Sequence, residues 1–87
     1  SYENLTKAIE VLNDVEDWNE ETLHQVLFDL IARLGVKNSL VLWPIRIAAS
    51  GKLVTPGGSI EILGLLGRDE SMRRLQIGQD ILTDVLR

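Results

Sequence analysis

The spacing of apolar residues along the chain predicts helices. Residues 1–15 carry a one-face repeat with intervals of three and four, formed by Leu5, Ala8, Ile9 and Leu12. A longer apolar stripe runs from Leu23 to Leu34. Asn19 precedes this stripe as a good N-cap, and Gly35 follows it as a C-terminal stop. We therefore predict a helix over residues 1–15 and a second over residues 20–34.

The third segment is more ambiguous, because its apolar run from Leu40 to Leu42 also suits a buried strand. Pro44 argues against a central strand, where its missing N–H breaks the ladder, and is acceptable near a helix start. Ala48 and Ala49 then favour a helix. We predict a helix capped by Asn38 or Ser39 and ending near Ser50, before Gly51.

The remaining chain predicts a loop and two further helices. Residues 52–58 contain Pro and Gly in a turn pattern. Ser59 is expected to cap a short helix that ends at Gly67, and Arg68 or Asp69 to begin the last one. The chain is thus predicted to form an all-α compact bundle of about five helices, a single helical domain over residues 1–87. The third helix is expected at its centre because it has almost no polar face.

Composition limits the class of protein. Eighty-seven residues with 45% apolar content suit one folded domain with a modest core. No apolar run approaches the roughly 20 residues that span a bilayer, and no signal peptide is visible, so we expect no membrane partner and a cytoplasmic location. The absence of cysteine excludes disulfides and cysteine metal sites. The chain starts at Ser1, which suggests a piece of a longer protein.

Charge is distributed unevenly along the chain. Residues 1–29 carry a net charge of −7, residues 30–60 of +4 and residues 61–87 of −1. The positive third contains Arg33, Lys37, Arg46 and Lys52 and no acid. An overall charge of −4 argues against nucleic acid in general. The local excess permits an anionic partner in this segment.

No residue pattern predicts catalysis or a metal. The single histidine, His24, has no partner at metal or triad spacing and is expected on a partly exposed helix surface. Ser50 and Ser59 have no candidate base nearby in sequence. Gly51-Lys52 is followed by Leu53 and lacks the earlier glycine of a phosphate loop.

Arg46 is the candidate recognition residue. It is the one charge on an apolar helix, and its planar fork suits a base edge or a phosphate. The residues alone favour a salt bridge to an acid such as Glu61, or extension of the guanidinium into solvent. Trp43 is predicted to lie in the core. The loop from Thr55 to Gly58 offers a hydroxyl, free amides and bare backbone that a splayed base can approach.

An ordered series of short motifs resembles the C-terminal anticodon-binding domain of bacterial-type glutamyl-tRNA synthetases, which are class I aminoacyl-tRNA synthetases. The series comprises Pro44-x-Arg46-x-Ala48-x-Ser50-Gly51, Thr55-Pro56-Gly57, Ile60-Glu61-Ile62-Leu63, Leu66-Gly67-Arg68-Asp69 and Met72-Arg73-Arg74-Leu75. The segment from Trp18 to Leu23 also fits. Gly58-Ser59-Ile60 stands where some relatives have bulkier residues.

The resemblance implies a helical cage that grips the anticodon of tRNA(Glu). The implied anticodon contacts are Arg46, Thr55, Pro56, Gly57, Gly58, Ser59 and Ile60. Lys52, Arg68, Arg73 and Arg74 are candidate phosphate contacts. The chain is then a C-terminal fragment without catalytic residues, metal or cofactor, which contacts neighbouring domains of its parent. The parent is a ligase that uses ATP and Mg²⁺ in a separate catalytic domain. Whether it also charges tRNA(Gln) stays open.

A helical protein–protein interaction or docking module without an RNA role is the alternative. The position of Arg46 discriminates between the two functions. An accessible guanidinium beside the Thr55-Pro56 loop favours RNA recognition, whereas one sealed against Glu61 favours a scaffold.

Overall fold

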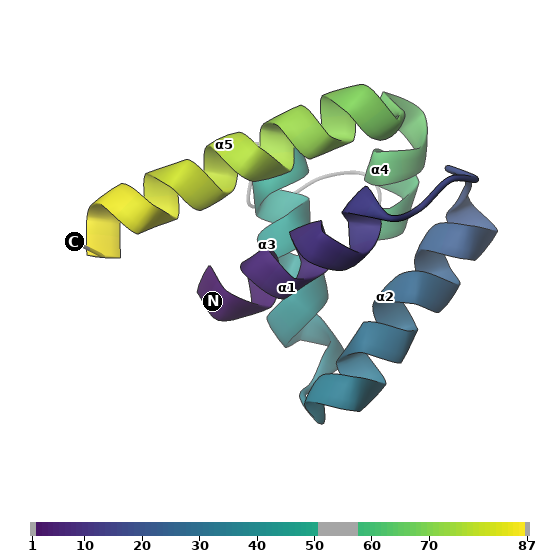
Figure 1. The fold of residues 1–87 in the computed structure, drawn as a ribbon, viewed down its shortest axis with the longest axis horizontal. Helices are drawn as coiled ribbons and strands as arrows, with labels where there is room; N and C mark the ends of the chain where they lie inside the picture. Colours follow the sequence, from purple (N-terminus) through teal and green to yellow (C-terminus); the bar gives the residue numbers. More distant parts are fainter. Residues whose placement is uncertain (1, 51–57, 87) are drawn as a thin grey trace.

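The computed structural model describes residues 2–50 and 58–86, which fold into the predicted all-α bundle (Figure 1). The helices are α1 (Tyr2–Asn13), α2 (Glu20–Leu34), α3 (Asn38–Ser50), α4 (Ser59–Leu66) and α5 (Arg68–Leu86). No helix in the described ranges is long and apolar enough to cross a membrane.

The ends of α2 form as the sequence predicts. The Asn19 side chain accepts a hydrogen bond from the Thr22 amide at 2.8 Å, which satisfies one of the unpaired N–H groups of the first turn. Gly35 adopts φ 66°, a left-handed conformation, and its amide donates to the carbonyls of Ile31 and Ala32. Glycine takes this conformation without the steric cost of a Cβ atom.

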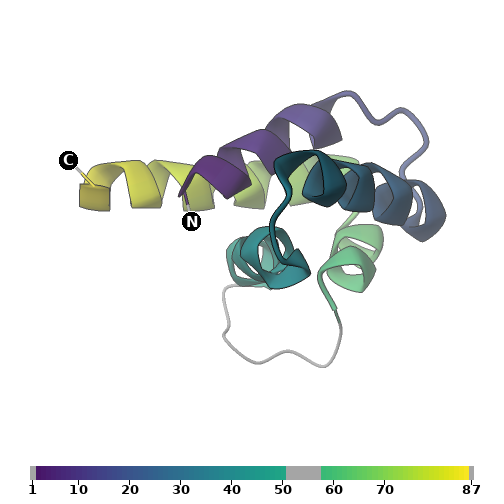
Figure 2. The ribbon, with the colours of Figure 1, turned by 90° about the horizontal axis from the view of Figure 1, so that it is seen from below.

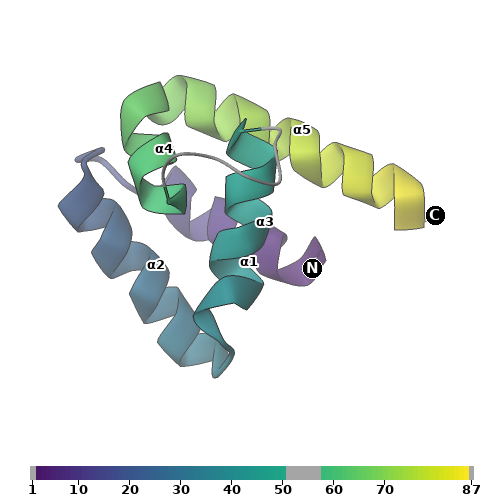
Figure 3. The same ribbon diagram turned by 180° about the vertical axis from the view of Figure 1, so that it is seen from behind.

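Helix α3 occupies the centre of the bundle, as predicted. Of the five described helices, it alone packs against each of the other four, and Figure 3 shows it lying between α2 and α5. Val41, Ile45 and Ala49 recur at intervals of four residues on α3 and are fully buried. They pack into a core with apolar residues of the neighbouring helices, including Leu5, Leu27, Leu63 and Leu75.

Pro44 lies inside α3, six residues after its first residue, rather than near its start. The helix was predicted correctly, and the position of Pro44 within it costs one backbone hydrogen bond. Pro44 has no N–H to donate to the Leu40 carbonyl, its partner one turn earlier. The Asn4 side chain of α1 donates to that carbonyl at 3.0 Å. A polar contact from α1 thus compensates for the break in α3.

Helix α4 begins at Ser59 with Gly58 as its N-cap, so the prediction that Ser59 caps the helix was wrong. The Ser59 hydroxyl instead donates to the Leu42 carbonyl of α3 at 2.5 Å. This bond fixes the start of α4 against the middle of α3. At its other end, α4 stops at Gly67, which has φ 81°, as the sequence predicts.

Helix α5 crosses α1 and α3, and its C-terminal end projects past the other helices (Figure 1). Figure 2 shows α1 and α5 on one side of the molecule, and α3 and α4 on the other. A methyl group at Gly78 would lie 2.8 Å from the Ala48 Cβ atom. Glycine at this position therefore permits the close approach of α5 to α3.

Candidate nucleic-acid interface

Arg46 lies on α3 with its guanidinium carbon 5.6 Å from the centroid of the Trp43 ring. The two residues are three apart on the helix, so they share a face. The arginine side chain leans toward the N-terminal turn, which is the usual tilt of helical side chains. This cation–π contact orients the guanidinium, and the arginine remains half-buried.

Trp43 is not a core residue, and the prediction that it would be was wrong. Its relative exposure is 45%. The buried face of α3 is formed by Val41, Ile45 and Ala49, and Trp43 lies to one side of it. The structure therefore presents an aromatic surface directly beside Arg46.

Four of the predicted contact residues, Lys52, Thr55, Pro56 and Gly57, lie outside the described residues. The other three predicted anticodon contacts beside Arg46 are described, and they differ in accessibility. Gly58 is exposed and Ile60 is half-buried. Ser59 is 7% exposed, and its hydroxyl is bonded to α3. The serine hydroxyl therefore holds α4 in place, whereas Gly58 presents backbone to solvent.

Gly58, Ser59 and Ile60 border a hollow of about 490 Å³ between α4 and the first half of α2. The rings of His24 and Phe28 stack along it, with centroids 4.2 Å apart and planes 15° from parallel. His24 is exposed on the helix surface, as predicted. Carboxylates from Glu20, Glu21 and Glu61 also border this hollow, which makes it unfavourable for a phosphate.

Arg68 is bonded to the protein rather than presented to solvent. Its guanidinium donates to the carbonyl of Val15 and, at 2.8 Å, to that of Asn13. Asn13 is the last residue of α1, where carbonyls lack partners within the helix. A cation there also interacts favourably with the helix dipole. The sequence suggested a phosphate contact, whereas the geometry gives Arg68 a capping role.

Arg74 and Arg73 share the carboxylate of Glu70. The Arg74 Nη1 atom donates to the Ala49 carbonyl at 2.8 Å, near the end of α3, and its Nε atom donates to Glu70 at 2.6 Å. Arg73 donates to both oxygens of Glu70, at 2.9 and 2.6 Å, and is exposed. Hydrogen bonds from Arg73 and then Arg74 lower the pKa of Glu70 from 4.5 to about 2. Of these two arginines, Arg73 is the more accessible to a phosphate.

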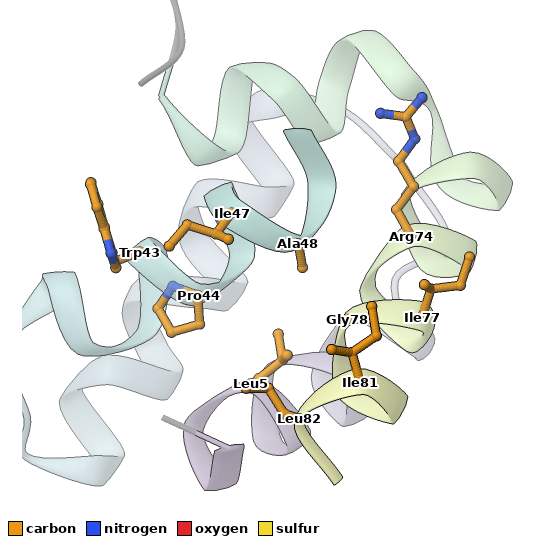
Figure 4. Close-up of a pocket in the computed structure, with 10 residues that line it drawn as sticks. All are labelled: Leu5, Trp43, Pro44, Ile47, Ala48, Arg74, Ile77, Gly78, Ile81 and Leu82. Carbon is orange, nitrogen blue, oxygen red and sulfur yellow. The ribbon is translucent and has the colours of Figure 1, made fainter. Parts of the chain in front are cut away.

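A groove of about 520 Å³, which Trp43 also lines, lies between α3, α5 and the start of α1 (Figure 4). Its lining is almost entirely apolar. Pro44, Ile47 and Ala48 line it from α3, and Ile77, Gly78, Ile81 and Leu82 from α5. Ile77 and Ile81 are 45% and 58% exposed. Trp43 thus lines an apolar groove and also contacts a cation.

Within the part of the chain that the structure describes, no three His, Asp or Glu side chains gather as metal ligands would. The charged groups with described partners are instead joined to helix ends and to one another.

Sequence reasoning missed two features of this surface. It did not predict that Trp43 is exposed, although Trp43 and Arg46 are three residues apart and therefore share a helix face. It also did not predict that Arg68 and Arg74 cap other helices. No local signal identifies those partners, since they lie 53 and 25 residues away in sequence.

The chain belongs to the anticodon binding domain family, whose model matches residues 1–79. Among similar proteins is the glutamate–tRNA ligase of Clostridium tetani, 51% identical over 78 residues, which are 90% of this chain and 16% of the ligase. The glutamate–tRNA ligase of Clostridium acetobutylicum is 46% identical over 78 residues, with the same coverage. That of Clostridium botulinum strain Hall is 45% identical over 86 residues, 94% of this chain and 18% of the ligase. The chain spans about a sixth of the length of these relatives.

Proposed function

We propose that this chain recognises the anticodon of a tRNA, as the anticodon-binding part of a glutamate–tRNA ligase. The observation that carries the proposal is the Arg46 guanidinium held 5.6 Å from the ring of an exposed Trp43. An oriented planar donor beside an aromatic surface suits an unstacked base, which offers an edge and a π-face. Membership of the anticodon binding domain family supports this function.

The partner that we propose is tRNA(Glu), because the similar proteins are glutamate–tRNA ligases. The positive charge of residues 30–60 provides local attraction within an acidic chain. A single module with few phosphate contacts is expected to bind weakly and with a marked dependence on salt. The docking-module alternative draws no support from the described contacts of Arg46 or from the relatives.

The parent protein that this proposal implies attaches glutamate to tRNA at the expense of ATP, in the cytoplasm. ATP and Mg²⁺ would bind to a catalytic domain outside this chain, and neighbouring domains of the parent would pack beside it. The part played by these 87 residues is selection of the tRNA. Arg46 would read a base edge, the Thr55-Pro56 segment and Gly58 would approach an anticodon base, and Arg73 and Lys52 would contact phosphates.

The test is a binding titration with matched arginine variants. Wild type, Arg46→Ala and Arg33→Ala are titrated with tRNA(Glu), with tRNA(Glu) altered at each anticodon base, and with an unrelated tRNA. Arg33 is an exposed arginine on α2 and in the same positive segment, so it controls for charge alone. Loss of a base-reading arginine costs about 1–3 kcal/mol and relaxes preference at one base.

The expected result is that Arg46→Ala loses discrimination at one anticodon position, whereas Arg33→Ala retains it. An equal loss of affinity for correct and altered anticodons would exclude base reading by Arg46. Wild-type binding that does not distinguish tRNA(Glu) from the unrelated tRNA would contradict the proposed function as a whole.

A further inference from the structure

We propose that Trp43 is a base-contacting residue whose indole ring stacks on one anticodon base, next to the base edge that Arg46 reads. The inference rests on the proposed function and adds a stacking residue to it. Trp43 lies 45% exposed on a helix whose other large side chains are mostly buried or half-buried. Tryptophan is enriched at binding interfaces, where its large ring supplies contact area.

The position of Trp43 on α3 places it in line with predicted anticodon contacts. Trp43, Arg46 and Ser50 are spaced by three and four residues, so they form one stripe along the helix. The stripe ends where the 51–57 segment begins. On the adjacent side, the Ser59 hydroxyl bonds to the carbonyl of Leu42, the residue before Trp43. The start of α4, with its exposed Gly58, therefore lies at the same level of α3 as the indole.

The Arg46 contact determines what can stack on the ring. The guanidinium lies 5.6 Å from the ring centroid, and Trp43 as a whole is still 45% exposed. A base that stacks on the ring would adjoin Arg46, the one charged residue of α3. Bases stack on aromatic rings with little dependence on sequence, whereas arginine reads their edges. Trp43 is therefore expected to supply affinity, and Arg46 to supply preference.

A hydrophobic side chain of another protein is the competing occupant of this surface. The adjoining groove is apolar enough for such a partner. Two observations favour a base instead. The ring carries a cation on its face, and the sequence segment that contains Trp43, residues 30–60, has a net charge of +4 without an acid. An anionic strand with exposed aromatic bases matches both features.

The decisive experiment pairs removal of the ring with removal of each base. Wild type, Trp43→Leu and Trp43→Tyr are titrated with a synthetic RNA hairpin carrying the anticodon arm of tRNA(Glu). Three further hairpins each lack one anticodon base but keep the sugar and phosphate. Loss of a stacked aromatic weakens binding to the intact hairpin by about 5- to 150-fold in Trp43→Leu. Trp43→Tyr, which keeps a ring, is expected to retain most of the affinity.

The expected signature is non-additivity at one position. With the base that stacks on Trp43 removed, wild type and Trp43→Leu bind with the same affinity. At the other two positions the full loss persists. An equal loss for all three abasic hairpins would overturn the stacking role, because a misfolded or merely electrostatic variant gives that result.

Tryptophan emission gives an independent measurement on the unmodified protein. The chain has two tryptophans, and Trp18 is half-buried with its Nε1 atom bonded to the Leu63 carbonyl at 2.8 Å. The difference between wild type and Trp43→Leu isolates the emission of Trp43. Stacking is expected to quench this emission on saturation with the intact hairpin and not with the hairpin that lacks the stacked base.

Two outcomes separate this inference from the proposed function. Base-selective binding that is unchanged in Trp43→Leu, together with self-association that the variant loses, assigns Trp43 to a protein interface and overturns the inference alone. Absence of selective binding by the wild type contradicts the proposed function, whatever the behaviour of the variant.

Discussion

Two helices carry the arginines that the sequence associates with RNA, and they use them differently. On α3, Arg46 lies over an exposed aromatic ring. On α5, Arg68 and Arg74 donate to main-chain carbonyls near the ends of α1 and α3. The first arrangement leaves an oriented cation beside an accessible surface. The second uses the cations to satisfy carbonyls that have no partner within their own helices.

The difference shows that proximity in sequence to a recognition motif does not assign a role to an arginine. Arg68 and Arg74 follow α4 closely and belong to the same resemblance as Arg46. Their partners, however, are backbone atoms that only the tertiary fold brings near. Substitutions on α5 are therefore expected to change stability, and substitutions on the Arg46 surface to change recognition.

The largest effect on stability is expected for Arg68→Ala. The change leaves the carbonyls of Asn13 and Val15 without their charged donor, and hydrogen bonds to charged groups contribute about 1.5–3 kcal/mol each. Because water replaces part of the lost hydrogen bonding to these carbonyls, we expect a loss of about 2–3 kcal/mol in the free energy of unfolding. Urea denaturation followed by circular dichroism measures it, with Arg33→Ala as the exposed control. Full stability combined with weakened RNA binding would reverse the assignment of Arg68.

A smaller loss is expected for Gly78→Ala, which tests the contact that brings α5 to α3. The added methyl would lie 2.8 Å from the Ala48 Cβ atom, so the helices must move apart and strain the Arg74–Ala49 bond. Overpacking costs about 1–3 kcal/mol, while alanine gains roughly 0.5–1 kcal/mol over glycine within a helix. A net loss of about 1 kcal/mol is expected from these two terms.

The matched control for Gly78→Ala is the double variant with Ala48→Gly, which transfers the small residue to the other helix. It is expected to remove the clash and recover most of the packing contribution, with a residual loss from glycine in α3. Failure of the double variant to exceed Gly78→Ala in stability would exclude close approach at this position as the cause.

The sequence predicted the elements well where local chemistry determines them. Asn19 and Gly35 define the ends of α2 through contacts within a few residues, and the apolar repeat of α3 identifies its central position. The errors arose where a contact with a residue distant in sequence determines the local structure. Pro44 is tolerated within α3 because Asn4 donates to the Leu40 carbonyl, and Ser59 bonds across to α3 rather than capping α4.

The candidate site was predicted less completely than the fold. Arg46 was identified from its residue type and its isolation on an apolar helix. Trp43 was assigned to the core because apolar helices usually bury tryptophan, although its spacing from Arg46 places the two on one face. The side on which α3 leaves surface uncovered depends on where α4 and α5 cross it, and residue spacing within α3 carries no information on that.

A pH-dependent contribution to stability is expected from Glu70. Its pKa is lowered from 4.5 in the unfolded chain to about 2 in the folded protein by Arg73 and Arg74. The ionised carboxylate therefore stabilises the fold fully above about pH 4.5, and this contribution is lost as the pH falls toward about 2. Urea midpoints measured from pH 6 downward are expected to fall more steeply for wild type than for Glu70→Gln. Parallel profiles would show that the pairing does not contribute to folding.

The smallest effect on stability is expected for Arg73→Ala. The Arg73 side chain is 61% exposed, and its bond to Glu70 spans three residues of one helix, a kind of surface pair that contributes little. Glu70 also keeps Arg74 as a partner. The urea midpoint is therefore expected to fall only slightly below the wild-type value. If Arg73 contacts a phosphate, as its exposure allows, the variant binds all anticodons more weakly and the salt dependence of binding loses about one unit of slope.

Arg74→Ala is the contrasting variant on the same helix, because it loses the hydrogen bond to the Ala49 carbonyl and is expected to lower stability rather than the salt slope. If both variants changed the salt slope, Arg74 would contact a phosphate as Arg73 does. The arginines of α5 would then not be restricted to stabilising helix ends.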